Sequence, residues 1–301
     1  MLIARLSSKP VYAIAFSPDG RWLAAQTGGG TTFLLSVPSF AKHHVWETEE
    51  TIFEGSLSFS GDSRYLACGG YGGVHVWAID SPADPVLKLA TQDGQLAFRP
   101  GSSEIFVHSR NAGTRRWAIP FGERLPGGWG GAHEGRTGPS KGIAFHPDGT
   151  RYAAAFGKRG ENSDEAWIEL WTTGSGRRLA RIEPQPHAVR FEAMRFSPDG
   201  STFAAVHSAK LRVLNGTWEQ ELATREVGTK HFKGLAYSAD GQRIVTVSND
   251  QSVRVWRAPS WEQATTYDWR IGKLTCIDAS ADGCLFAAGS GSGKLVIWDA
   301  M

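Results

Sequence analysis

FSPDG, at residues 16–20, decides the fold because six variants of it follow along the 301-residue chain. The later copies are FSGDS (59–63), FRPGS (98–102), FHPDG (145–149), FSPDG (196–200), YSADG (237–241) and ASADG (279–283). Successive copies start 39 to 51 residues apart. A repeat of this period indicates stacked supersecondary units. Such units must share their cores, because about 40 residues cannot bury enough apolar surface alone.

Each copy has the chemistry of a tight turn between two strands. Pro presets the backbone at the first turn position, Asp accepts local amide hydrogens, and Gly takes the positive φ that closes a hairpin. We expect the aromatic residue before the turn to end a strand and to pack between neighbouring sheets. These residues are Phe16, Phe59, Phe98, Phe145, Phe196 and Tyr237. The seventh copy has Ala279 instead, so we expect Phe286 to supply that contact.

Residues 232–267 show what one unit contains. Four short runs rich in Val, Ile, Thr and aromatic residues alternate with Gly, Asp, Asn, Ser and Pro clusters, which predicts a four-stranded antiparallel meander. Most units carry a tryptophan near the end of the third run, and we expect these indoles to act as wedges between sheets. They are Trp77, Trp117, Trp171, Trp256 and Trp298.

Seven such units predict an all-β, seven-bladed β-propeller that forms a single domain over residues 1–301. The last unit stops after its third strand, at LVIWDAM, whereas an extra strand-like segment at residues 2–6 precedes the first unit. We therefore expect residues 2–6 to become the outer strand of the final blade. This pairing would close the ring and cover a sheet edge.

Composition argues against several classes of function. Lys and Arg number 32 against 30 Asp and Glu, without a long run of one sign, which speaks against a nucleic-acid partner. No apolar run approaches 18 residues and the N-terminus has no signal-like core, so we expect no membrane association and a cytoplasmic location. The three cysteines, Cys68, Cys276 and Cys284, lack metal-ligand spacing, and we expect buried free thiols.

The repeated turns, the placed tryptophans and the final Trp298-Asp299 pair resemble the WD-repeat (WD40-type) β-propeller family over essentially the whole chain. That resemblance implies a protein-binding role. Members of the family carry a His, Ser or Thr, Asp and Trp set in each blade. In the sixth unit Ser248, Asp250 and Trp256 hold those places, but Gly228 replaces the His. We expect apolar packing to hold the blades more than this polar set does.

Two insertions break the regular period, at 125–140 between units three and four and at 157–166 within unit four. Alternation of connections in a meander places both on one face, beside the link at 184–190. Loops on a rigid scaffold commonly carry function, and exposed Trp and Arg are frequent in interfaces. The candidate partner-binding residues are Trp129, His133, Arg136, Lys158, Arg159, His187 and Arg190. A loop without a specific partner is the alternative.

Catalytic motifs are weak. We expect no metal site, no cofactor and no catalytic residue, because the nine histidines are scattered and no hydrolase elbow occurs. The first strands are mostly small and apolar, with Glu192, Arg195 and Asp278 as exceptions that we expect to lie too far apart for acid–base work.

The chain is thus interpreted as a non-catalytic scaffold that binds a protein or peptide partner on the insertion-bearing face near blade four. We expect a monomeric propeller within a complex. The alternative is an enzyme or small-molecule binder that uses the central channel, of a lyase or hydrolase type. A propeller cut from a larger protein is a third interpretation.

Overall fold

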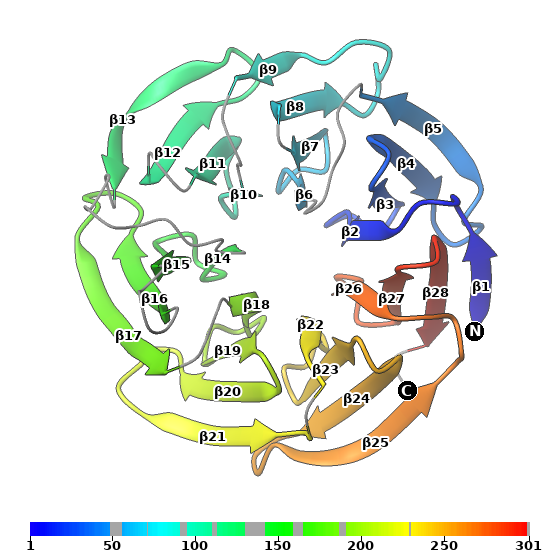
Figure 1. Ribbon diagram of the computed structural model, residues 1–301. Coiled ribbons are helices and arrows are strands. Elements are labelled where there is room, and N and C mark those ends of the chain that lie inside the picture. Colours follow the sequence, from blue (N-terminus) through cyan, green and yellow to red (C-terminus); the bar gives the residue numbers. More distant parts are fainter. Residues whose placement is uncertain are drawn as a thin grey trace.

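Seven four-stranded antiparallel sheets stand around a central axis in the computed structural model (Figure 1), which describes residues 1–48, 56–70, 72–90, 95–109, 113–129, 142–158, 165–186, 191–228 and 230–299. Each sheet is a blade whose strands follow one another outward from the axis. The predicted seven-bladed all-β propeller is confirmed. No helix long and apolar enough to span a membrane occurs in this described part of the chain.

The strands fall into four concentric rings, from the axis to the rim. The innermost are β2 (Val11–Phe16), β6 (Ser56–Phe59), β10 (Gln95–Phe98), β14 (Ile143–Phe145), β18 (Phe191–Phe196), β22 (Phe232–Tyr237) and β26 (Leu274–Ala279). The second are β3 (Trp22–Thr27), β7 (Tyr65–Gly70), β11 (Glu104–Ser109), β15 (Arg151–Lys158), β19 (Thr202–His207), β23 (Arg243–Ser248) and β27 (Leu285–Ser290). The third are β4 (Thr31–Ser36), β8 (Gly73–Ala78), β12 (Gly113–Ala118), β16 (Glu165–Thr172), β20 (Lys210–Asn215), β24 (Ser252–Arg257) and β28 (Lys294–Asp299). The outermost are β5 (Lys42–Glu47), β9 (Leu87–Leu89), β13 (Glu123–Trp129), β17 (Arg178–Pro186), β21 (Glu221–Glu226), β25 (Glu262–Asp268) and β1 (Leu2–Arg5).

Ring closure uses the first strand of the chain as the last strand of the seventh blade. β1 pairs antiparallel with β28, from Leu2 opposite Ile297 to Arg5 opposite Lys294. The Leu6 amide continues the contact by donating to the Gly293 carbonyl at 3.0 Å. The predicted closure is confirmed, with a strand one residue shorter than expected. It places the first and the last strand of the chain side by side in one blade (Figure 1).

The repeated turn folds as its composition predicts, and its first copy shows how. The Asp19 carboxylate accepts from the Ser17 hydroxyl at 2.6 Å and from the Arg21 amide at 3.1 Å. Gly20 has a φ of 72°, a conformation that glycine adopts without steric cost. The Asp19 amide donates to Ser63 Oγ in the next blade at 3.0 Å, so the turn also links neighbouring blades. We call the side of the ring that bears these turns the turn face, and the opposite side the insertion face.

Aromatic residues before the turns fill the spaces between blades. All except Phe145 are at least nine-tenths buried, and Phe286 lies in a core cluster that also contacts Ala279, as expected. Among the five tryptophans, Trp77, Trp117 and Trp256 are buried. The cysteines form no disulfide. The expectation that all three are buried is wrong, because Cys284 follows the Asp282-Gly283 turn and is exposed.

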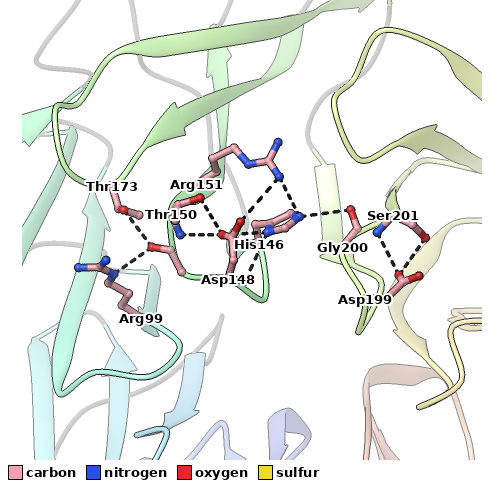
Figure 2. Close-up of polar contacts among 10 residues, drawn as sticks. Arg99, His146, Asp148, Thr150, Arg151, Thr173, Asp199, Gly200 and Ser201 are labelled. Carbon is pink, nitrogen blue, oxygen red and sulfur yellow. Dashed lines mark hydrogen bonds and ion pairs between the residues drawn. The ribbon is translucent and has the colours of Figure 1, made fainter.

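Blade four is joined to both neighbours on the turn face (Figure 2). The Gly149 carbonyl accepts from Arg99 Nε of blade three and from Thr173 Oγ1 of blade four, each at 2.9 Å. On the other side His146 Nε2 lies 3.3 Å from the Gly200 carbonyl of blade five. Arg151 Nη2 lies 2.9 Å from the same His146 nitrogen, and His146 Nδ1 lies 2.9 Å from the Asp148 carboxylate. These contacts fix blade four within the ring.

A buried imidazole makes the stability of blade five depend on pH. His207 ends β19, is 3% exposed and packs edge-on against Phe191, and neither of its ring nitrogens has a hydrogen-bond partner in the described residues. Burial lowers the pKa of His207 from 6.5 to about 4, and the charges of Arg212 and Lys210 act in the same direction. The folded state therefore favours the neutral ring.

Stabilisation by neutral His207 is complete above pH 6.5 and is lost as the pH falls toward 4, because the unfolded state binds the proton first. We expect the free energy of unfolding to fall by about 2–3 kcal/mol over this window. In His207→Phe, which keeps a planar apolar ring, this component should be absent. Urea titrations at pH 7 and pH 4 measure the difference. Equal losses in both proteins would contradict the assignment.

Candidate functional site

Only two of the seven predicted partner-binding residues lie in the part of the chain that the structure describes. Trp129 is the last residue of β13, where its backbone pairs with Thr114, and Lys158 is the last residue of β15, where it pairs with Glu165. The side chains at both positions lie outside what the structure describes. The remaining candidates are also outside the described residues: His133, Arg136, Arg159, His187 and Arg190. The seven residues therefore stay predictions.

The insertions begin as strand and not as loop, which corrects their expected bounds. β15 and β16 have eight residues each and β17 has nine, whereas most strands of the ring have six. The β15–β16 ladder continues to Lys158 opposite Glu165, and Glu165 in turn pairs with Pro186 of β17. The extra length lies at the insertion-face end. Two additional residues carry a strand about 6 Å further, so blade four projects from this face.

A tryptophan and arginine pair lies near this end of blade four. Trp167 of β16 is 6% exposed, stacks on Phe156 at 5.9 Å between ring centroids, and has the Arg181 guanidinium 4.7 Å above its ring. Its indole N–H donates to the buried Glu169 carboxylate, which also pairs with Arg178 at 3.1 Å. The sequence interpretation missed Trp167 and Arg181. The sequence signal that could have revealed them is the alternation of side chains on two neighbouring, paired strands, one carrying Trp167 and the other Arg181.

The insertion-face end of the central channel carries an ion pair. A space of about 120 Å³ there is lined by residues of all seven innermost strands. Lys233 Nζ of blade six donates to Glu192 Oε1 of blade five at 2.8 Å, and the Glu192 side chain is 5% exposed. Lys233 thus pairs with Glu192, which the sequence analysis considered only beside Arg195 and Asp278. Lys233 was missed because it stands at the start of an otherwise apolar strand.

The turn-face end of the channel carries two further charges, from blades five and seven. Arg195 and Asp278 line one hollow of about 350 Å³. The Asp278 Oδ2 atom accepts from the Phe16 amide of blade one at 2.9 Å. Burial raises the pKa of the Asp278 carboxyl, while the Arg195 guanidinium and the Phe16 amide oppose that rise. The two groups line one hollow and influence each other electrostatically, from two blades with blade six between them.

Metal chemistry finds no support in the described residues, where no group of three or more His, Cys, Asp or Glu side chains is placed to hold an ion. The described channel lining includes no histidine. What the channel presents is one carboxylate and one cation at each end.

Three segments of the chain match a known repeat. The family described as "WD domain, G-beta repeat" (WD40) matches residues 2–34, 224–257 and 264–299, and these segments lie in blades one, five, six and seven. These segments are similar to WD40 repeats, and the chain as a whole folds as a seven-bladed β-propeller.

Curated relatives of this chain include proteins that are named as subunits. The guanine nucleotide-binding protein subunit beta of rice (Oryza sativa subsp. japonica) is 22% identical over 310 residues, which cover 98% of this chain and 69% of the relative. Eukaryotic translation initiation factor 3 subunit I of Neurospora crassa is 31% identical over 65 residues, covering 22% of this chain and 19% of the relative. Actin-interacting protein 1 of Drosophila melanogaster is 29% identical over 111 residues, covering 35% and 17%.

The WD40 polar set is rearranged in blade six. The Trp256 indole N–H donates to Thr246 Oγ1 at 2.9 Å and not to Ser248, whose hydroxyl donates to the His231 carbonyl at 2.9 Å. Asp250 pairs with Arg254 at 2.7 Å and with the Ser252 amide at 3.0 Å. Burial by itself raises the pKa of the Asp250 carboxyl. The hydrogen bonds from Arg254 and Ser252 outweigh this effect and lower the pKa to about 2. The residues present at the family positions therefore hold local contacts within the blade.

Proposed function

We propose that this propeller is a non-catalytic scaffold that binds a protein or peptide partner on its insertion face, around blade four. Two of the relatives are named as subunits and one as an actin-interacting protein, which supports a role among protein partners. We further propose a monomeric propeller in the cytoplasm. Light scattering of the purified protein and fractionation of the host cell test these two points.

The observation that carries the proposal is the projection of blade four. Its strands β15, β16 and β17 exceed the usual six residues, and all the extra length lies at the insertion-face end. β13 of blade three also continues to Trp129, toward the same sector. A projecting edge on a closed ring presents backbone and side chains in fixed positions, so little ordering entropy is lost when a partner binds.

Blade four is also fixed by contacts on the turn face. The contacts of Gly149 with Arg99 and of His146 with Gly200 tie it to blades three and five on the opposite face (Figure 2). Trp167 is 6% exposed and packs beneath Arg181, whereas the exposed Arg181 is a cation of the kind that interface hot spots favour. The seven sequence candidates stay predictions for this sector.

Partner capture from the native host tests this proposal. The triple variant Trp129→Ala, Arg136→Ala, Arg159→Ala should lose capture at least tenfold and keep the wild-type melting temperature, because a few central residues carry most of an interface's binding energy. Quantitative mass spectrometry of tagged wild-type and variant proteins measures the loss.

The matched control is Phe121→Ala. Phe121 is an 89% exposed aromatic in the turn between β12 and β13 of blade three, on the turn face. Its removal should leave capture unchanged. Full capture by the triple variant, or equal loss in the control, would rule out this sector as the docking surface.

The alternative of an enzyme in the channel required carboxylates and imidazoles gathered at one mouth. The described channel residues instead offer one carboxylate per end, each facing a cation. This arrangement favours binding over acid–base chemistry.

A further inference from the structure

The hollow at the turn-face mouth of the channel arises from small residues where other blades have large ones. Ala279 of blade seven stands where six blades have an aromatic residue, and Ala239 and Ala281 stand where the repeated turn commonly has proline. All three alanines line the hollow of about 350 Å³. The missing side chains account for the space.

Two opposite charges enter this space at one level of the ring. Arg195 and Asp278 each occupy the position immediately before the end of an innermost strand. The equivalent residues of the other five blades are small and uncharged: Ala15, Ser58, Ala97, Ala144 and Ala236. Arg195 is largely exposed within the channel, where one of its Nη atoms donates to the Met194 carbonyl at 3.0 Å. The guanidinium has further donors that this carbonyl does not occupy.

Asp278 is placed for a second task besides its contact with blade one. Its Oδ2 atom accepts from the Phe16 amide at 2.9 Å. A carboxylate has about four acceptor sites, so the backbone amides of Phe16 and Ala279 do not use its full capacity. Because burial makes the charged form costly and Arg195 only partly offsets this, an added cation in the hollow would be favoured.

We propose that this hollow binds a small zwitterion of the α-amino acid type, whose carboxylate lies on Arg195, whose ammonium lies on Asp278 and whose side chain packs on the alanines. The planar guanidinium matches a carboxylate in a two-bond fork, and an ammonium offers three donors to an acceptor. Phe196 and Tyr237 border the hollow and give an apolar side chain a wall. The site is on the face opposite to the proposed docking sector and does not depend on it.

Calorimetric titration of the purified full chain with L-leucine, L-methionine and L-phenylalanine tests the proposal. We expect at least one to bind with millimolar or better affinity, and its N-acetyl and C-terminal amide derivatives to bind at least tenfold more weakly. Each derivative removes one of the two charges that the hollow recognises. If none of the three amino acids gives a heat of binding at a concentration of about 10 mM, the proposal is overturned. Equal binding of the blocked derivatives would overturn it as well.

Variants of the protein add a second test. Asp278→Asn keeps an oxygen for the Phe16 amide but removes the partner of the ammonium, and Arg195→Gln removes the partner of the carboxylate. Each should weaken the bound probe at least tenfold. Glu262→Gln changes an exposed charge on the outermost strand of blade six, β25, and should have no effect. Unchanged affinity in both hollow variants would refute the assignment. The blocked derivatives on the wild-type protein decide the matter if a variant does not fold.

Discussion

Deletion of residues 1–6 is expected to lower the free energy of unfolding of the propeller by about 3–5 kcal/mol. The deletion removes a strand that pairs with β28 over four residue positions, and each lost backbone hydrogen bond costs about 1 kcal/mol net. It also removes Leu6, which packs on the core cluster shared by the first and seventh blades. Thermal unfolding followed by circular dichroism measures the loss as a lower melting temperature.

The matched control for this deletion changes side chains and keeps the strand. Leu2 and Ile3 are 42% and 43% exposed, so Leu2→Thr with Ile3→Thr should cost less than about 1 kcal/mol. A wild-type melting temperature of the truncated chain would show that backbone pairing at the rim does not hold the ring closed. An equal loss of stability in the control variant would show the same. Increased self-association of the truncated chain is a second expected result, because an uncovered sheet edge pairs readily with other chains.

Trp256→Ala should destabilise the protein by about 3–5 kcal/mol, the range for removal of a large buried aromatic side chain. Trp256 is 2% exposed and lies in the core cluster between blades five and six. The substitution also leaves Thr246 Oγ1 without its indole partner. Denaturant unfolding at neutral pH gives the change in free energy.

Two companion variants separate packing from the hydrogen bond. Trp256→Phe keeps most of the apolar volume and should cost about 1–2 kcal/mol. Trp298→Ala removes the tryptophan at the same strand position of blade seven, where the side chain is partly exposed, and should cost less than Trp256→Ala. A larger loss of stability for Trp298→Ala than for Trp256→Ala would show that burial does not determine how much each tryptophan contributes to stability.

The architecture was accessible from the sequence because each turn is specified locally. Asp19, for example, accepts hydrogen bonds only from residues within two positions of it, and Gly20 supplies the backbone conformation that closes the turn. Seven such local specifications at a regular spacing predict the number of blades, and counting strands predicts the closure. The rearranged contacts of Trp256 were not accessible, since Thr246 and Ser248 face the same side of one strand and only the register of β23 against β24 distinguishes them.

The channel charges show why a site is harder to predict than a fold. Arg195 and Asp278 are in different blades, with blade six between them, so no short-range pattern connects them. They line one hollow together with the small Ala236 of the blade between them. The partner-binding residues stay predictions for a different reason: loop composition indicates where a surface can vary but does not determine how it is arranged.

The pairing of β1 with β28 has a mechanical consequence. Leu2 faces Ile297, so the two ends of the chain leave the ladder at the same end of the pair. Tension applied through both ends would load the hydrogen bonds one after another, as in unzipping, and not all together in shear. A ring that is stable to heat would therefore open under a small pulling force, starting at the rim of blade seven.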